Sequence, residues 1–131
     1  MLMKWLHKLA SMHYPLRPPG AVSEDRFIQL CIRCRKCVEV CPFKSIKISH
    51  GFPGIDEGTP YIVPREIPCY LCMKCPPVCP TGALKNNIKK EEVKMGIAAI
   101  NQSTCMAYNG IICRACFERC PMYREAIILK D

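Results

Sequence analysis

The sequence predicts a small, loop-rich α+β fold with short helices and short strands. The main reason is its cysteine content, since 12 of the 131 residues are cysteines, grouped in three blocks that each end in Cys-Pro. Short apolar stretches follow the blocks. The chain also has few aromatic residues (8%) and many prolines (12). Such a chain has little apolar core to offset the entropy of folding, so the cysteines are expected to hold it together.

The secondary structure is expected to consist of short elements around the cysteine blocks. The run from Ser23 to Leu30 predicts a helix with Ser23 as its N-cap. Residues 86–94 are polar and predict an exposed loop or helical turn, and residues 108–110 predict a tight turn. Apolar stretches predict strands at residues 45–48, 61–63, 97–100 and 126–129.

The chain is interpreted as two segments. Residues 1–22 are an N-terminal arm with a Pro-rich connector, and residues 23–131 are one domain that carries all three blocks. Apolar residues at helical spacing in residues 1–13 predict an amphipathic helix that packs on the domain or on a partner, or lies on a membrane surface. The prolines that follow it force an extended connector.

The start of the chain is interrupted by Lys4, His7 and Lys8, so it does not predict a secretory signal. No stretch approaches the ~20 apolar residues of a membrane-spanning helix. The expected location is therefore the cytoplasm, with the periplasm as the alternative if an export signal is missing from this chain. Structural disulfides are rare in a reducing cytoplasm, so twelve cysteines favour bound metal.

The first two blocks have the spacing C-x2-C-x2-C-x3-C-P without a gap. This run is typical of the [4Fe–4S] cubanes of bacterial ferredoxins. Two-residue gaps let one tight loop place three thiolates on three corners of a cubane, and the amides of that loop can donate hydrogen bonds to its sulfides. The fourth cysteine lies beyond the reach of the loop. The expected ligands are Cys31, Cys34, Cys37, Cys41, Cys69, Cys72, Cys75 and Cys79.

The third block has a wider first gap, which the turn at residues 108–110 can span. Its expected ligands are Cys105, Cys113, Cys116 and Cys120. The cysteines thus predict three [4Fe–4S] clusters, with a fourth if the full protein continues past Asp131. Zinc is a distant alternative, because zinc ribbons gain nothing from a third cysteine at the same interval. Disulfides are disfavoured because close triplets pair poorly among themselves.

Three blocks leave the pairing of ligands open. In two-cluster ferredoxins the fourth cysteine of each run completes the cluster of the other run. If blocks two and three exchange, Cys120 completes the second-block cluster and Cys79 the third-block cluster, which gives two complete exchanged ligand sets. The first-block cluster then takes Cys41 or a residue outside this chain. An open coordination site there would allow a catalytic role, which is a rival interpretation.

The formal charge of +8 would suggest nucleic acid or an anionic surface. Four thiolates around an oxidised cubane carry about −2, so three clusters would offset about six charges, and no nucleic-acid partner is expected. Basic residues near the clusters could tune the potential, dock an acidic partner or balance charge: Arg33, Arg35, Lys36, Lys74, Arg114 and Arg119. Apolar residues expected to shield the clusters from water are Ile32, Val38, Leu71, Val78, Ile112 and Phe117.

The segments around the cysteines resemble a known family. Residues 16–20 (LRPPG), 31–34 (CIRC), 58–69 (GTPYIVPREIPC) and 79–84 (CPTGAL), with the wide-gapped third block, resemble the ferredoxin-type proteins of periplasmic nitrate reductase and methylamine-utilisation systems. The resemblance implies four motifs and four [4Fe–4S] clusters, with first-to-fourth and second-to-third exchange. It also implies a relay of electrons between quinol-side partners and a redox enzyme.

Small iron–sulfur subunits of tungsten- or molybdenum-pterin oxidoreductases are similar as well, and the absence of a recognisable export signal makes that setting our expectation. The chain is therefore expected to be a ferredoxin-like polyferredoxin with bacterial two-cluster repeats. It would relay single electrons to or from a catalytic oxidoreductase subunit in a hetero-oligomer, with no catalytic residue of its own. The alternative is a quinol-side ferredoxin component of a nitrate-reductase-type chain.

Overall fold

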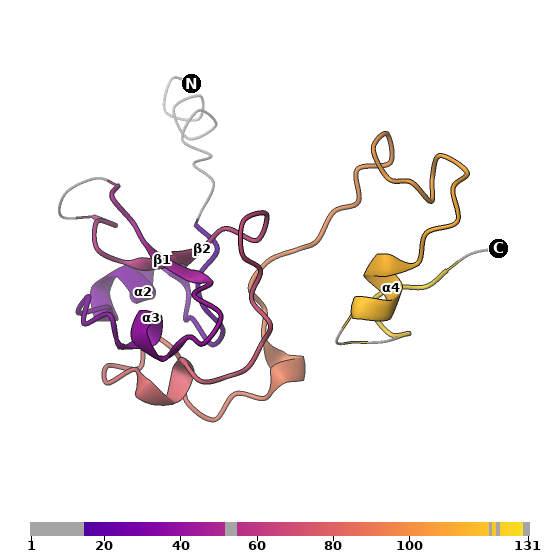
Figure 1. Ribbon diagram of the computed structural model, residues 1–131. Coiled ribbons are helices and arrows are strands. Elements are labelled where there is room, and N and C mark those ends of the chain that lie inside the picture. The colour runs from indigo at the N-terminus through magenta and orange to yellow at the C-terminus, as the bar shows by residue number, and fades with distance from the viewer. Residues whose placement is uncertain (1–14, 52–54, 121, 123, 130–131) are drawn as a thin grey trace, which may run out of the picture. The chain divides into compact units, whose positions relative to one another are not determined.

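The computed structural model describes residues 15–51, 55–120, 122 and 124–129 (Figure 1). Contacts between residues divide the chain into two compact units, Met1–Gly96 and Ile97–Asp131. All elements are short, in agreement with a loop-rich α+β fold. They are α2 (Glu24–Leu30), α3 (Lys36–Val40), β1 (Ile46–Ile48), β2 (Pro60–Ile62), the 3-10 turns η1 (Pro76–Val78) and η2 (Lys90–Glu92), and α4 (Ala115–Arg119).

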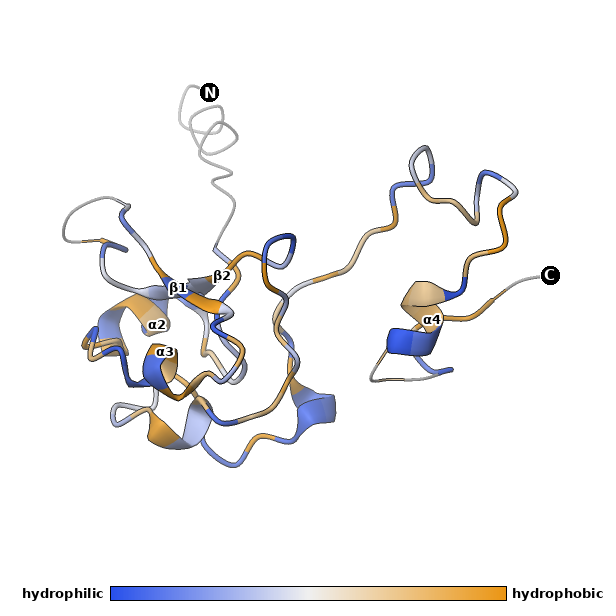
Figure 2. Cartoon of the chain, in the orientation of Figure 1, coloured by the Kyte–Doolittle hydropathy of each residue, from blue (hydrophilic) through white to orange (hydrophobic). Residues whose placement is uncertain are grey.

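The two strands form an antiparallel pair in which Ile46 faces Ile62 and Ile48 faces Pro60. Hydrophobic and hydrophilic residues alternate along β1 (Figure 2), as expected for a strand with one face buried. The predicted strands at residues 45–48 and 61–63 are thus confirmed. The predicted helix after Ser23 is also confirmed as α2, although no hydrogen bond from the Ser23 side chain caps it.

The Pro-rich segment is part of the first unit in the described residues. The Ile62 amide donates to the Leu16 carbonyl at 2.8 Å, so the segment adds a bridge at the edge of β2. Further along, Ala21 forms a bridge with Leu84. Gly20 adopts a φ of +82°, and a side chain there would meet the backbone of Lys85 at 2.9 Å. The predicted helix in residues 1–13 lies outside the described residues, and the boundary at residue 22 stays a prediction.

Arg17 joins three parts of the first unit and is itself only 6% exposed. Its Nε donates to Glu24 Oε2 at 2.9 Å, which ties the Pro-rich segment to α2. Its Nη1 donates to Thr59 Oγ1 at 2.9 Å and to the Pro60 carbonyl at 2.8 Å, which ties the same segment to β2. The guanidinium also lies 4.7 Å from the centre of the Phe27 ring. A buried charge is thereby fully paired.

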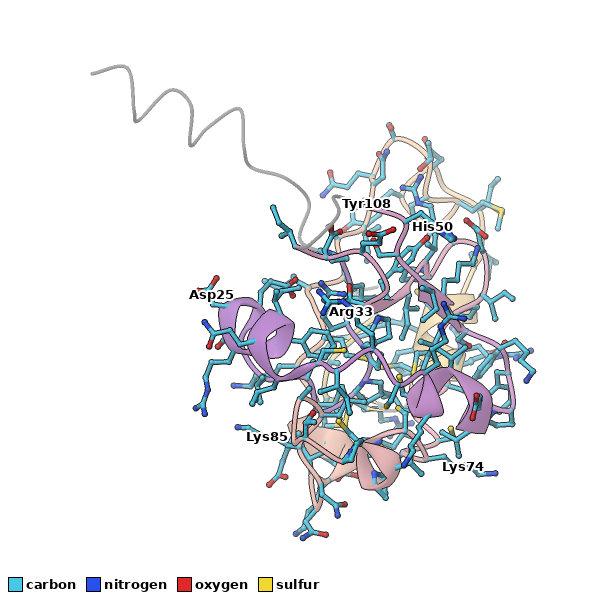
Figure 3. The ribbon with its side chains drawn as sticks, turned by 90° about the vertical axis from the view of Figure 1, so that its left-hand side faces the viewer. Asp25, Arg33, His50, Lys74, Lys85 and Tyr108 are labelled. Carbon is cyan, nitrogen blue, oxygen red and sulfur yellow. The ribbon has the colours of Figure 1, made fainter. Side chains whose placement is uncertain are left out.

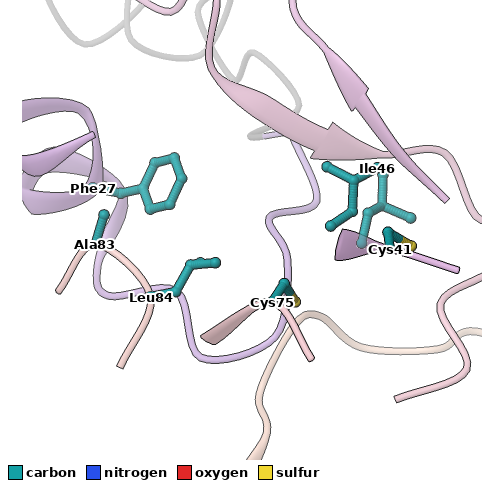
Figure 4. Close-up of a cluster of buried hydrophobic side chains, with 7 residues drawn as sticks. Phe27, Cys41, Ile46, Cys75, Ala83 and Leu84 are labelled. Carbon is teal, nitrogen blue, oxygen red and sulfur yellow. The ribbon is translucent and has the colours of Figure 1, made fainter. Parts of the chain in front are cut away.

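The core of the first unit depends on cysteine. Its buried apolar side chains extend from Phe27, Ala83 and Leu84 through Cys75 to Cys41 and Ile46 (Figure 4), with Ile62 completing the cluster. Partly buried Cys31, Cys37, Cys69 and Cys79 pack against it. The ordinary apolar residues are too few to form a separate core, as the composition suggested.

The second unit has one short helix, α4, and no strand among its described residues. The predicted strands at residues 97–100 and 126–129 are therefore wrong. Ile97 is 98% exposed, and Ala126 instead closes a turn by donating to the Met122 carbonyl at 3.1 Å. An apolar run becomes a strand only where a neighbouring chain accepts its hydrogen bonds. The predicted turn at residues 108–110 is confirmed, with the Gly110 amide bonded to the Ala107 carbonyl.

Replacing Arg17 by alanine should destabilise the first unit by about 3 kcal/mol, because it leaves Glu24 and Thr59 without their buried partner. We expect cluster absorbance to bleach at least about tenfold faster in a fixed concentration of guanidinium. Arg26→Ala, an exposed change on α2, the helix to which Arg17 is bonded, is the control and should leave the rate nearly unchanged. Equal rates for the two variants would contradict the bridging role of Arg17.

Candidate metal centre

Two cysteine loops of the first unit share one backbone conformation. In residues 31–37 (loop I) the residues on either side of Cys34, Arg33 and Arg35, have φ of 58° and 62°. In residues 69–75 (loop II) the residues around Cys72, Leu71 and Met73, have φ of 50° and 56°.

Non-glycine residues rarely adopt the left-handed region, and such strain persists where the surroundings require it. Alternating left-handed residues turn successive amides to one side, which makes a concavity for an anion. Both loops therefore have the backbone that a negatively charged cluster needs.

A short helical turn carries each loop to its fourth cysteine. Cys37 lies in α3, whose C-cap is Cys41, and Cys75 precedes η1, whose C-cap is Cys79. The amide of each fourth cysteine closes the turn, with Cys41 bonded to the Val38 carbonyl at 3.3 Å and Cys79 to the Pro76 carbonyl at 3.2 Å. Because α3 and η1 contact each other, each fourth cysteine is carried toward the other loop.

The two fourth cysteines exchange between the loops. One cavity, of about 400 Å³ including its opening to solvent, is lined by Cys31, Cys34, Cys37 and Cys79, which we call site I. A second cavity, of about 290 Å³ by the same measure, is lined by Cys69, Cys72, Cys75 and Cys41, which we call site II. Each site thus takes three thiols from one loop and the fourth from the other.

This pairing corrects the exchange expected between blocks two and three. Cys79 lies with the first-block cysteines, and Cys41 lies with the second-block cysteines. Each site already has four thiols, so neither needs Cys120. The first-block site is therefore complete with Cys79, not with Cys41 or with a residue from outside the chain. The interpretation that an open coordination site supports catalysis loses its basis.

The environment of Cys41 favours its thiolate. Burial alone would raise the pKa of Cys41, but backbone amides of Ser45, Phe43 and Ile46 donate to its sulfur and outweigh burial, so the pKa is lowered. A thiolate is the form that binds metal. The hydroxyl of Ser45 also fixes this turn by donating to the Pro68 carbonyl at 2.8 Å.

Cys79 has the same arrangement of donors. Burial opposes the thiolate, but amides of Leu84, Thr81 and Ala83 together with the Thr81 hydroxyl lower the pKa of Cys79. The Leu84 amide lies 3.4 Å from the sulfur and the Thr81 hydroxyl 3.8 Å. Donors at the second, fourth and fifth residues after the cysteine therefore recur in both halves. Ser45 and Thr81 were not predicted as site residues, although Thr81 follows a Cys-Pro by one residue and Ser45 follows one by three.

The inner cysteines show that the two sites are neighbours. Burial raises the pKa of Cys37 to about 11, with a contribution from Cys31. Burial raises the pKa of Cys75 to about 12, with contributions from Cys69 and from Cys37 of the other loop. A negative charge on Cys37 thus raises the pKa of Cys75. Binding of metal to these thiols must displace their protons at neutral pH.

The donor set fits [4Fe–4S] clusters. Four thiols surround a cavity in each site, with strained loop amides and short helical turns in matching positions. Among the described residues, no three His, Cys, Asp or Glu side chains converge closely enough to hold a single metal ion. Cys31, Cys34, Cys37 and Cys79 would hold one cluster, and Cys69, Cys72, Cys75 and Cys41 the other.

The third block lacks this backbone. Between Cys105 and Cys120, all of which is described, only Gly110 has a positive φ. The side-chain amide of Asn109 holds the wide first gap by donating to the Cys105 carbonyl at 2.8 Å. Cys116 is exposed, and the third-block cysteines line neither of the two cavities. A cluster on Cys105, Cys113, Cys116 and Cys120 stays a prediction.

Shielding by apolar residues agrees only in part with the sequence-based expectation. Ile32 lines site I but is 61% exposed, and Ile112 in the second unit is 94% exposed. Phe27, which was not among the predicted shielding residues, is fully buried and lines site I.

Comparison with known proteins agrees with this geometry. Residues 30–83 match the family model of the 4Fe-4S dicluster domain, and this range contains all eight cysteines of sites I and II. No solved structure matches the chain. No described helix is long and apolar enough to span a membrane.

Among characterised proteins the chain is similar to ferredoxin-type proteins. It is 41% identical over 119 residues to the ferredoxin-type protein NapG of Escherichia coli, covering 88% of this chain and 52% of NapG. It is 40% identical over 119 residues to the methylamine utilization ferredoxin-type protein MauM of Methylorubrum extorquens, covering 88% and 54%. NapG of Haemophilus influenzae is 35% identical over 127 residues, covering 93% and 46%. The chain spans about half the length of these relatives.

The exchange predicts which cysteines act together. Cys34→Ala, Cys79→Ala and the double variant should each lose the same amount of iron, about four atoms per chain, because both cysteines belong to site I. Cys72→Ala with Cys79→Ala should cost about twice as much, because those cysteines belong to different sites. Iron analysis after anaerobic loading measures this. The pairing would be contradicted if the Cys34/Cys79 double variant lost the sum of the iron lost by the two single variants. It would also be contradicted if a Cys79/Cys113 double variant lost no more iron than the Cys79 single variant.

Proposed function

We propose that this chain, a homologue of NapG and MauM whose residues 30–83 form a 4Fe–4S dicluster domain, relays single electrons between a quinol-side donor and a redox enzyme. Iron–sulfur electron transfer of the ferredoxin type is its general function. The observation that carries the proposal is the adjacency of two four-cysteine sites, since Cys37 of site I lies close enough to influence Cys75 of site II.

The residues of the chain have distinct roles in this relay. The clusters, when bound, supply the one-electron chemistry. Loop amides and the donors to Cys41 and Cys79 stabilise the negative charge of each cluster. The packed turns α3 and η1 keep the sites at a fixed separation. Three clusters remain our expectation, two in the first unit and a third on the third block.

The quinol-side interpretation has better support than a tungsten- or molybdenum-pterin partner. The sequence resembles ferredoxin-type proteins of nitrate-reductase and methylamine-utilisation systems, and the relatives carry the names NapG and MauM. None of the relatives described above is named as a subunit of a tungsten- or molybdenum-pterin oxidoreductase. We propose that the partner is a catalytic oxidoreductase subunit in a hetero-oligomer. The proposed compartment is the cytoplasm, with the periplasm as the alternative, and cell fractionation distinguishes them.

Anaerobic loading with iron and sulfide should give brown protein with at least about eight iron atoms per chain. After reduction by dithionite, the EPR spectrum should show broadening by interaction between two neighbouring spins, because sites I and II adjoin. Stoichiometric zinc without iron would refute the proposal.

A redox titration tests the quinol-side role. At least one cluster should be reducible by menaquinol. If all clusters are reduced only far below the quinone potential, that result would favour a pterin partner.

A further inference from the structure

Loops I and II have the same backbone but carry different side chains. The two left-handed positions hold Arg33 and Arg35 in loop I but Leu71 and Met73 in loop II. The last residue before the third cysteine is lysine in both, Lys36 and Lys74. Conformation therefore does not require arginine at these positions, since leucine and methionine adopt the same φ in the other loop.

These differences give the two sites different surroundings. Site I is lined by Arg33, Arg35 and Lys36, all of which are exposed. Site II is instead lined by an aromatic pair, Phe43 and Tyr70, whose ring centres lie 4.5 Å apart. In the view of Figure 3, sulfur atoms lie between Arg33 and Lys74, which mark the two loops.

The cations of loop I are not used in ion pairs of the described residues. The ion pairs found among the described residues join Arg17 to Glu24 and Lys47 to Glu66. Arg33 donates to two carbonyl oxygens, those of Glu57 at 2.7 Å and Ile55 at 3.3 Å, and to no carboxylate in the part of the chain that the structure describes.

We propose that residues 32–36 of loop I form the docking and electron-exchange face for an acidic redox partner. The proposal rests on the proposed function and specifies where the partner binds. Cys34 and Ile32 are exposed in this segment, and both line site I together with the three cations. Exposed apolar and charged side chains occur together in transient interfaces. A carboxylate-rich surface would be attracted over a distance of about a Debye length and oriented on site I.

The same charges make site I the place from which the electron leaves. Reduction adds one negative charge to a cluster, and nearby cations stabilise that form. Arg33, Arg35 and Lys36 would therefore stabilise an added electron on a cluster in site I more than on one in site II. With a reduced cluster bound in site I, the loop I face would be the place where one electron passes from that cluster to an oxidised acceptor.

The loop I face can be tested on the full, iron-loaded chain by measuring how fast small charged oxidants take electrons from it. Dithionite-reduced protein is mixed at low salt with ferricyanide, an anion, or hexaamminecobalt(III), a cation. Arg35→Met inserts the residue of loop II and should lower the ferricyanide rate by about threefold without lowering the hexaamminecobalt rate. High salt should abolish the difference.

Matched variants complete the design. Lys74→Gln removes one charge from loop II and should leave both rates unchanged. If Arg35→Met fails to load iron, Lys36→Gln provides the same test. The docking face would be overturned if the variants gave normal EPR spectra but the oxidation rates changed on substitution of Lys74 or Arg114 and not on substitution in loop I. That result would leave the electron-transfer function intact. Absence of iron–sulfur spectra in the unmodified chain would instead refute the proposed function.

Discussion

The first unit depends on the exchange of one thiol between two cysteine loops. Loop I cannot complete its site without Cys79, and loop II cannot complete its site without Cys41. This exchange ties segments almost forty residues apart, roughly the spacing of the repeat, into one body. A pair of three-residue strands and a seven-residue helix would be marginal alone. Buried Cys41 and Cys75 make the metal sites and the apolar core continuous.

The arrangement has an approximate internal symmetry. Left-handed residues on either side of the second cysteine, a short turn after the third, and three amides directed at the fourth recur in both halves. The symmetry is limited to the backbone and its hydrogen bonds. Side chains at equivalent positions differ, with arginines in loop I where loop II has leucine and methionine. Two sites of one construction thereby acquire different electrostatic surroundings.

Much of the first unit could be predicted from the sequence. Cysteine spacing indicated the eight thiols of sites I and II, and apolar alternation indicated β1 and β2. Spacing shows how far a loop can reach but not which loop it faces, so the partner of Cys79 stayed open, and the exchange with the third block that the resemblance implied differs from the structure. Burial of Arg17 was also unpredictable, because its partners Glu24 and Thr59 come together only in the fold. Residues 97–100 looked like a strand, but no neighbouring strand accepts their hydrogen bonds in the described chain.

The central claim is that thiols from both loops complete each cluster. The most direct test is a crystal structure of the loaded protein with anomalous scattering measured at the iron edge. We expect one cluster bonded to Cys31, Cys34, Cys37 and Cys79, and an adjoining one bonded to Cys69, Cys72, Cys75 and Cys41. A cluster that joins Cys79 to third-block cysteines, or Cys41 to its own loop, would contradict it.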